Sequence, residues 1–137
     1  MEWLIDMFGV RDPYKGEDTY FKKNPKVGGM MTEDNMIILN PYSKLTPEQK
    51  NAVALNEAIR LVIKKSNFPV EFDLTEKQKE FFKGTEYEKN EDEAKKSILA
   101  RLLTNDSSVQ EPSEEQLNVA NTLKSYIESM NPNSAKK

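Results

Sequence analysis

The chain has 137 residues, the length of one ordinary domain, which can bury roughly two thirds of its unfolded surface around a single core. Its 23 acidic and 20 basic residues leave a net charge of −3, which argues against a general nucleic-acid-binding protein, because such proteins carry an excess of basic residues. The sequence contains no cysteine and no histidine, which removes disulfides, thiolate metal sites and the commonest general base and zinc ligand. The mean hydropathy of −0.77 predicts a soluble protein. We also predict that the protein has no cofactor, no secretion signal and no membrane span.

An apolar segment, EWLIDMFGV, occupies residues 2–10 and offers little polar surface to water. Gly9 and Pro13 are expected to break any helix there. Two interpretations stay open: the segment packs on its own domain, or it docks on another chain, because terminal apolar segments are often ordered by what they bind. We treat residues 1–12 as a separate N-terminal segment and as the first candidate for partner contact, through Trp3, Leu4, Ile5, Met7 and Phe8.

Residues 11–35 are rich in turn-forming residues and mix charges with aromatic rings. Lys22, Lys23 and Lys26 lie near those rings, a combination that can stack nucleic-acid bases. Acids interrupt the window, so a solvated loop with buried ring anchors is favoured, and whether these lysines contact phosphate stays open. Gly28 and Gly29 belong to no GxGxxG or Walker pattern. The second choice for partner contact is Tyr14, Tyr20 and Phe21.

Residues 27–39 predict a β-hairpin, because the apolar runs VGGMM and MIIL flank the polar tetrapeptide TEDN. The run MIIL is continuous rather than alternating, which predicts a strand covered on both faces. Residues 46–65 then predict the central helix, with Thr46 as its cap, Pro47 at its first position and Gln49 closing a capping box. The hairpin is expected to lie against this helix. The predicted buried face consists of Ala52, Val53, Leu55, Ala58, Ile59, Val62 and Ile63.

Further helices are predicted from three pairs of capping residues: Thr75 with Gln78, Asn90 with Glu93, and Ser113 with Gln116. The first of them should stop at Gly84, the second near residues 105–106, and the apolar face of the last should contain Leu117, Ala120, Leu123 and Ile127. The predicted fold class is α+β and helix-dominated, with about four helices around a central helix and one β-hairpin. We expect one compact domain over residues 13–130 and a flexible tail at 131–137.

The pentapeptide Asn56-Glu57-Ala58-Ile59-Arg60 has the spacing of the HExxH helix of zinc peptidases. Both ligand positions are wrong, because Asn56 is a poor zinc ligand and Arg60 is a permanent cation. We therefore interpret Glu57 as an ion-pair partner of Arg60 or of another cation that the fold brings near, and a degenerate metallopeptidase-like scaffold without catalysis is the least favoured function. The sequence predicts no catalytic, cofactor-binding or metal-binding residues, and hence no enzyme.

The stretches NPYSKLTPEQ at 40–49 and NEAIR at 56–60, followed by LTEKQKEFFKGTEYEKNEDEAKKSILARLL, resemble small uncharacterised proteins of tailed bacteriophages, chiefly of marine hosts. The resemblance covers about residues 12–128 and implies no reaction. It implies a phage product, either a minor virion or assembly component or a protein that acts on the host. We predict a non-enzymatic protein-binding component, a minor structural or accessory protein of a phage particle or its assembly. Its partner would be a larger virion protein or a second copy of the chain, in the virion or the host cytoplasm. The alternative is a soluble inhibitor or regulator that binds a host protein through its acidic helix starts, which would weaken with salt.

Overall fold

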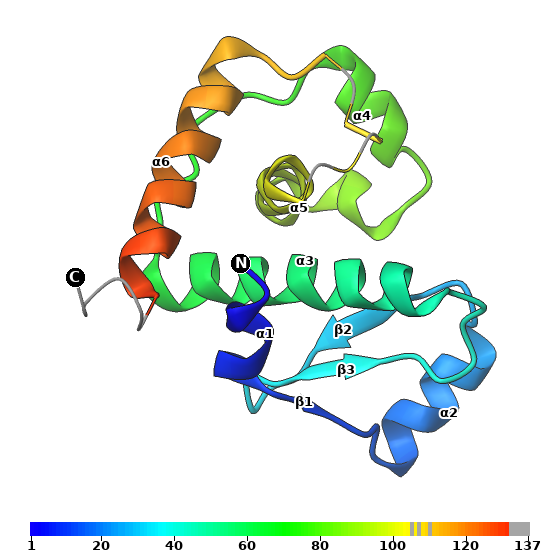
Figure 1. The fold of residues 1–137 in the computed structure, drawn as a ribbon. Coiled ribbons are helices and arrows are strands. Elements are labelled where there is room, and N and C mark those ends of the chain that lie inside the picture. Colours follow the sequence, from blue (N-terminus) through cyan, green and yellow to red (C-terminus); the bar gives the residue numbers. More distant parts are fainter. Residues whose placement is uncertain (105, 107, 110, 132–137) are drawn as a thin grey trace. The chain divides into compact units, whose positions relative to one another are not determined.

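A computed structural model gives the fold and describes residues 1–104, 106, 108–109 and 111–131 (Figure 1). These residues form six α-helices, one 3-10 helix and a three-stranded mixed sheet, and with 59% helix the predicted helix-dominated α+β class is confirmed. The chain divides into two compact units, Met1–Leu61 and Val62–Lys137. One domain over residues 13–130 stays a prediction. Of the predicted tail, all but Asn131 lies outside the described residues.

The sheet of the first unit has the strand order β1-β3-β2 (Figure 1). Strands β2 (Gly29–Met31) and β3 (Ile37–Leu39) pair antiparallel, which confirms the predicted hairpin. Its turn closes with a hydrogen bond of 2.9 Å from the Thr32 N–H to the Met36 carbonyl. Ile37 and Ile38 point to opposite faces of the sheet, and both are fully buried. The strand is therefore covered on both sides, as the run MIIL predicts.

Helix α1 (Trp3–Phe8) and strand β1 (Val10–Arg11) occupy the apolar N-terminal segment. The helix ends at Gly9, whose φ of 88° is a conformation that glycine adopts without strain. Strand β1 was not predicted; it pairs parallel with β3, and the Gly9 carbonyl accepts a hydrogen bond of 3.0 Å from the Ile37 N–H. The N-terminal segment is thus joined to the sheet of the first unit.

Helix α2 (Lys15–Lys23) lies where a loop was predicted, so the predicted loop was wrong, whereas the predicted buried ring is confirmed at Phe21. Phe21 is the one buried side chain of this helix, and the apolar periodicity that indicates a helix is therefore missing from the sequence. The helix starts with a hydrogen bond of 2.8 Å from the Tyr14 N–H to the Glu17 carboxylate. Lys22 and Lys23 lie in its last turn, where positive charge complements the helix dipole.

Helix α3 (Pro47–Ser66) is the predicted central helix. Its capping box forms as predicted, with the Thr46 N–H 2.9 Å from Gln49 Oε1 and the Gln49 N–H 3.2 Å from Thr46 Oγ1. The predicted buried face was wrong at Ala52, which is exposed, and too narrow, because the helix is covered on most sides between residues 57 and 63. The buried apolar side chains are Ala54, Ala58, Ile59, Leu61, Val62 and Ile63.

The second unit contains α4 (Glu76–Phe82), the 3-10 helix η1 (Glu86–Lys89), α5 (Glu91–Leu103) and α6 (Glu114–Met130). The three α-helices begin at the predicted caps: Thr75, Asn90 and Ser113 each accept a hydrogen bond from the third residue of the helix. Helix α4 ends before Gly84, as predicted, whereas the predicted end of α5 falls partly outside the described residues. None of the helices in the described part of the chain is long and apolar enough to cross a membrane.

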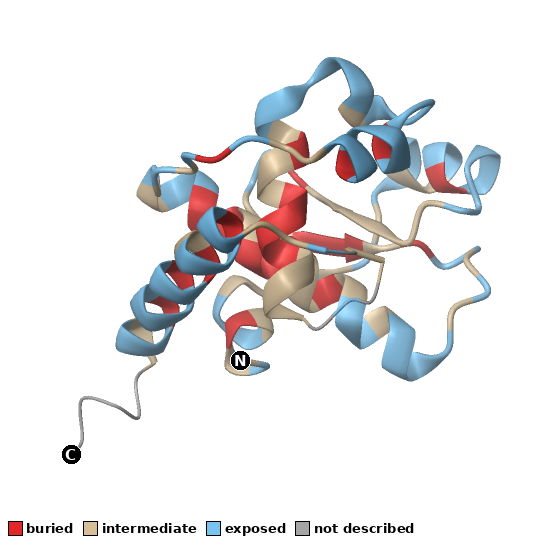
Figure 2. Ribbon diagram, turned by 90° about the horizontal axis from the view of Figure 1, so that it is seen from above, coloured by how far each residue is buried: buried red, intermediate tan, exposed pale blue. Residues whose placement is uncertain are grey.

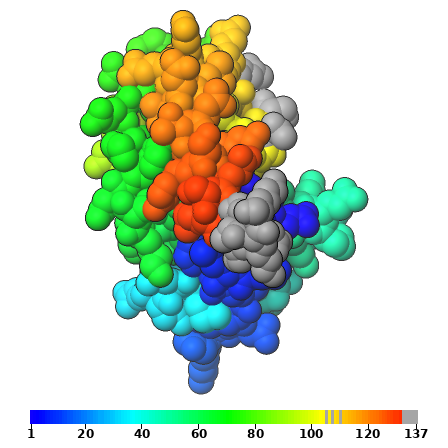
Figure 3. Space-filling view, turned by 60° about the vertical axis from the view of Figure 1, so that its left-hand side comes forward, coloured from blue at the N-terminus to red at the C-terminus, as the bar shows by residue number. Residues whose placement is uncertain are grey.

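Helix α6 buries one side and exposes the other (Figure 2), and its exposed side faces the viewer in Figure 3. Ala120, Leu123 and Ile127 are buried as predicted. The prediction was wrong for Leu117, which is 44% exposed, because its neighbour Gln116 takes the buried position at the start of the helix. The first turn of α6 therefore contributes the Gln116 amide, rather than an aliphatic side chain, to the core.

Gln116 binds Gln78, so the capping-box glutamines of α6 and α4 meet inside the second unit. Both side chains are buried, and each amide nitrogen donates to the other's Oε1 at 2.7 Å. Gln116 Nε2 also donates to the Asp73 carbonyl at 2.9 Å. The same amide oxygens accept the Thr75 and Ser113 N–H groups of their own helix starts. One buried hydrogen-bond network therefore joins two helix starts and the segment before α4.

Candidate interaction surface

The eight residues predicted to contact a partner are divided between the core and the surface of the first unit. Leu4 and Phe21 are fully buried, so they hold the fold and are not accessible to a partner. Met7, Tyr14 and Tyr20 are 49%, 64% and 42% exposed. The other three side chains are half-buried: Trp3, Ile5 and Phe8.

Val10 is an exposed apolar residue that the sequence analysis did not select. It lies on strand β1, directly after α1, and one residue before Arg11. We call Met7, Val10, Tyr14 and Tyr20 the exposed N-terminal residues. They come from α1, β1, the start of α2 and the body of α2, so β1 pairing and the packing of α2 position them.

Arg11 forms the centre of an ion-pair cluster beside Tyr14. Its guanidinium binds the Glu17 carboxylate with two hydrogen bonds, of 2.7 and 2.9 Å, and its Nε lies 3.4 Å from Asp34 Oδ2. The Tyr14 ring stacks on the same guanidinium, with 3.8 Å between Arg11 Cζ and the ring centroid. Glu17 belongs to α2, and Asp34 belongs to the hairpin turn. The Arg11 guanidinium therefore links three segments of the chain, namely β1, α2 and the hairpin turn.

Interactions within the cluster also shift the pKa values of its ionisable groups. The hydrogen bonds from Arg11, and then the Tyr14 N–H, hold the pKa of Glu17 below its ordinary value. The pKa of Asp34 is lowered first by the hydrogen bond from the Thr32 hydroxyl and then by Arg11. Both carboxylates in turn raise the pKa of Arg11. Carboxylates with lowered pKa are weak bases and are poorly matched to proton transfer at neutral pH.

These residues line an open concavity of about 490 Å³, which Met30 and Met31 extend along β2. Its arginine is already bound to two carboxylates, which makes it a poor receptor for a free anion. Among the described residues, no group of three or more acidic, cysteine or histidine side chains could hold a metal ion. Lys22, Lys23 and Lys26 are exposed but do not line the concavity. The arrangement suits contact with the side chains of another protein.

The stretch NPYS, which contributes to the phage resemblance, has a structural role beside this surface. Asn40 is buried, and its Nδ2 donates to the Asn24 and Val27 carbonyls at 3.1 and 2.7 Å. The Tyr42 hydroxyl donates to the Asp18 carboxylate at 2.8 Å, a hydrogen bond that raises the pKa of Tyr42. Asn40 therefore fixes the end of α2 and the loop after it, whereas Tyr42 holds the first turn of the same helix. Neither contact was predicted from the sequence.

The predicted pair of Glu57 and Arg60 forms within α3, with 3.4 Å between Arg60 Nη1 and Glu57 Oε1. Both side chains are about nine-tenths buried. The pentapeptide that has the spacing of a zinc-peptidase helix thus contains an ion pair between neighbouring helical turns, as interpreted from the sequence.

Replacing Arg11 with glutamine is expected to lower the stability of the protein at neutral pH and to lower it by less at acidic pH. A carboxylate whose folded pKa is lowered contributes stability above its unfolded pKa and loses it as the pH falls through the folded value. Glu17 and Asp34 are such groups, so the gap in urea midpoint between wild type and Arg11→Gln should shrink from neutral pH to about pH 2. Lys23→Gln, which removes an exposed charge from the same region, is the control. A gap that stays constant with pH would contradict this electrostatic role.

Comparison of the chain with protein-family models, curated proteins and solved structures finds no match.

Proposed function

We propose that the chain is a non-enzymatic protein-binding component that uses its exposed N-terminal residues. The observation that supports this proposal is the exposure of four large apolar side chains between Met7 and Tyr20, each at least 42% accessible. Methionine and tyrosine are enriched at protein interfaces, where they bury much area at a modest cost in conformational entropy. The lowered pKa values of Glu17 and Asp34 also favour a structural rather than a catalytic role for the neighbouring cluster.

The resemblance to proteins of tailed bacteriophages supports a role as a minor structural or accessory protein of a phage particle or its assembly. The partner in this proposal is a larger virion protein. Docking through apolar and aromatic side chains should persist at raised ionic strength, because salt screens charges but does not weaken burial of apolar surface.

The double variant Met7→Ser, Tyr14→Ser tests this proposal. We expect it to reduce capture of a phage structural protein from infected cells at least tenfold, because two accessible apolar anchors are lost. The matched control is Leu117→Ser, Tyr126→Ser, which removes side chains of similar exposure, 44% and 40%, from α6. Capture is measured by affinity purification and mass spectrometry, beside the solution mass of each variant from light scattering.

Equal capture by the two double variants would reject the exposed N-terminal residues as the docking surface. Point variants are preferred to removal of residues 1–10, because that deletion would also remove the buried Leu4 and the Gly9 carbonyl that binds β3. A folded circular-dichroism spectrum at the binding temperature shows that loss of capture is not loss of structure.

A further inference from the structure

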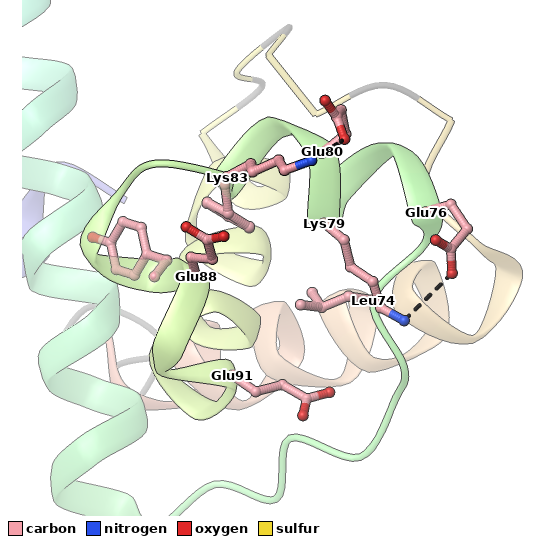
Figure 4. Close-up of a pocket in the computed structure, with 9 residues that line it drawn as sticks. Leu74, Glu76, Lys79, Glu80, Lys83, Glu88 and Glu91 are labelled. Carbon is pink, nitrogen blue, oxygen red and sulfur yellow. Dashed lines mark hydrogen bonds and ion pairs between the residues drawn. The ribbon is translucent and has the colours of Figure 1, made fainter.

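The second unit has an open cavity of about 420 Å³ formed by α4, η1 and the start of α5 (Figure 4). Its floor is apolar. The Leu74 side chain points into the middle of the lining residues in Figure 4, and the rings of Phe82 and Tyr87 meet edge to face with centroids 5.2 Å apart. Phe82 is buried, whereas Leu74 and Tyr87 are half-buried, so the floor is anchored in the core and remains open to a side chain from outside.

The rim of this cavity has more carboxylates than lysines. Its two lysines are already paired, Lys79 with Glu76 at 3.4 Å and Lys83 with Glu80 at 3.8 Å. These pairs leave both cations with a carboxylate neighbour on their own helix. The rim lysines are therefore poorly placed to receive an acidic ligand.

Glu88 and Glu91 lie on the other side of Leu74 from Glu76 (Figure 4). The Glu88 carboxylate accepts the Gly84 N–H at 2.9 Å, and Glu91 lies 3.6 Å from Lys95, which does not line the cavity. The lining residues include four carboxylates and two lysines, so the rim itself carries a net charge of −2. Negative charge is thus concentrated around an apolar floor, and it will attract cations to this face.

We propose that this cavity binds a segment of a partner protein that inserts one aliphatic side chain and flanks it with lysine or arginine. The aliphatic side chain would cover Leu74 and the ring pair, while the flanking cations approach Glu88 and Glu91. Charge complementarity decides the occupant, because the two ion pairs of the rim leave a net charge of −2 from Glu88 and Glu91, which would repel an acidic segment. The inference goes beyond the proposed function, since this surface does not involve the exposed N-terminal residues.

The test is a ¹H–¹⁵N NMR titration of the full chain with the peptide acetyl-Lys-Leu-Lys-amide. We expect saturable shifts confined to residues 74–91. The peptide acetyl-Lys-Gly-Lys-amide should bind about tenfold more weakly, because it has no aliphatic side chain to bury. The peptide acetyl-Glu-Leu-Glu-amide should give no saturable shifts, because its charges oppose those of the rim.

The charge contribution is tested with the double variant Glu88→Gln, Glu91→Gln, which retains an acceptor oxygen for the Gly84 N–H. We expect the dissociation constant of the Lys-Leu-Lys peptide to rise about fivefold. The matched control Glu114→Gln, Glu115→Gln removes two exposed acids from the start of α6 and should leave it unchanged.

Three results would overturn the inference: shifts that map elsewhere, equal binding of the glycine peptide, or equal weakening by the control variant. Each of them would show either that the protein surface attracts cations in general or that the cavity is not a binding site. None of them bears on the exposed N-terminal residues, whose capture experiment uses different variants, so the two proposals fail separately.

Discussion

Replacing Gln116 with glutamate is expected to lower the free energy of unfolding by about 3 kcal/mol at neutral pH. The Gln116 amide is fully buried, and its Nε2 donates to Gln78 Oε1 at 2.7 Å and to the Asp73 carbonyl at 2.9 Å. A carboxylate has no donor to offer, so its oxygens would face two acceptor oxygens at these distances. Burial would also remove the water that stabilises its charge.

The destabilisation should depend on pH in a defined direction. Burial and the facing oxygens raise the folded pKa of the introduced carboxyl above its unfolded value, because they disfavour the charged form. The penalty is therefore fully present above the folded pKa and shrinks as the pH falls through it, when the protonated acid can donate one hydrogen bond again. Urea unfolding of wild type and variant at about pH 7 and about pH 4 should show the gap narrowing in acid.

The third capping-box glutamine provides the matched control. Gln49 closes the box at the start of α3 with the same local geometry, but its side chain is exposed. Glutamate is a natural residue at that position and a negative charge suits a helix start, so Gln49→Glu should be neutral or slightly stabilising. Equal effects of Gln116→Glu and Gln49→Glu would show that the amide pair is not a buried determinant of stability.

The glutamines show which part of the fold the sequence could predict. A capping box is encoded within four residues, so the starts of α4 and α6 were predicted from Thr75 with Gln78 and Ser113 with Gln116. Their mutual hydrogen bonds were not predicted, because 38 residues separate the two glutamines and no local spacing indicates which helix starts meet.

The candidate surface was predicted only in part for a related reason. Apolar character alone does not separate core from interface, and so Leu4 and Phe21 were grouped with Met7 and Tyr14 although the fold buries them completely. The partners of Arg11 lie 6 and 23 residues away, on elements that were not predicted or whose packing could not be known. Strand β1 has two residues, which is too short for an alternating pattern to be recognised.

Replacing Gly29 with alanine is expected to destabilise the first unit by about 2 kcal/mol. Gly29 lies on β2, and a Cβ atom there would be 2.8 Å from the Ile38 carbonyl oxygen of the neighbouring strand. It would also lie 3.1 Å from Val53 Cγ1 on α3. A backbone oxygen in a paired strand cannot rotate away like a side chain, so β2 would have to shift from β3, and the contact with Val53 would also push it from α3. The glycine pair at 28–29 therefore permits close packing of the predicted hairpin on the central helix.

Replacing Gly16 with alanine should raise the stability of the protein rather than lower it. Gly16 lies inside α2, and a Cβ atom there would meet nothing within 4 Å. Alanine restricts the unfolded chain and favours the helix, which should stabilise the protein by up to about 1 kcal/mol. Thermal unfolding followed by circular dichroism should thus show a lower midpoint for Gly29→Ala and an unchanged or higher one for Gly16→Ala. If Gly29→Ala melts at or above the wild-type midpoint, β2 does not approach Ile38 of β3 and Val53 of α3 as closely as these two distances indicate.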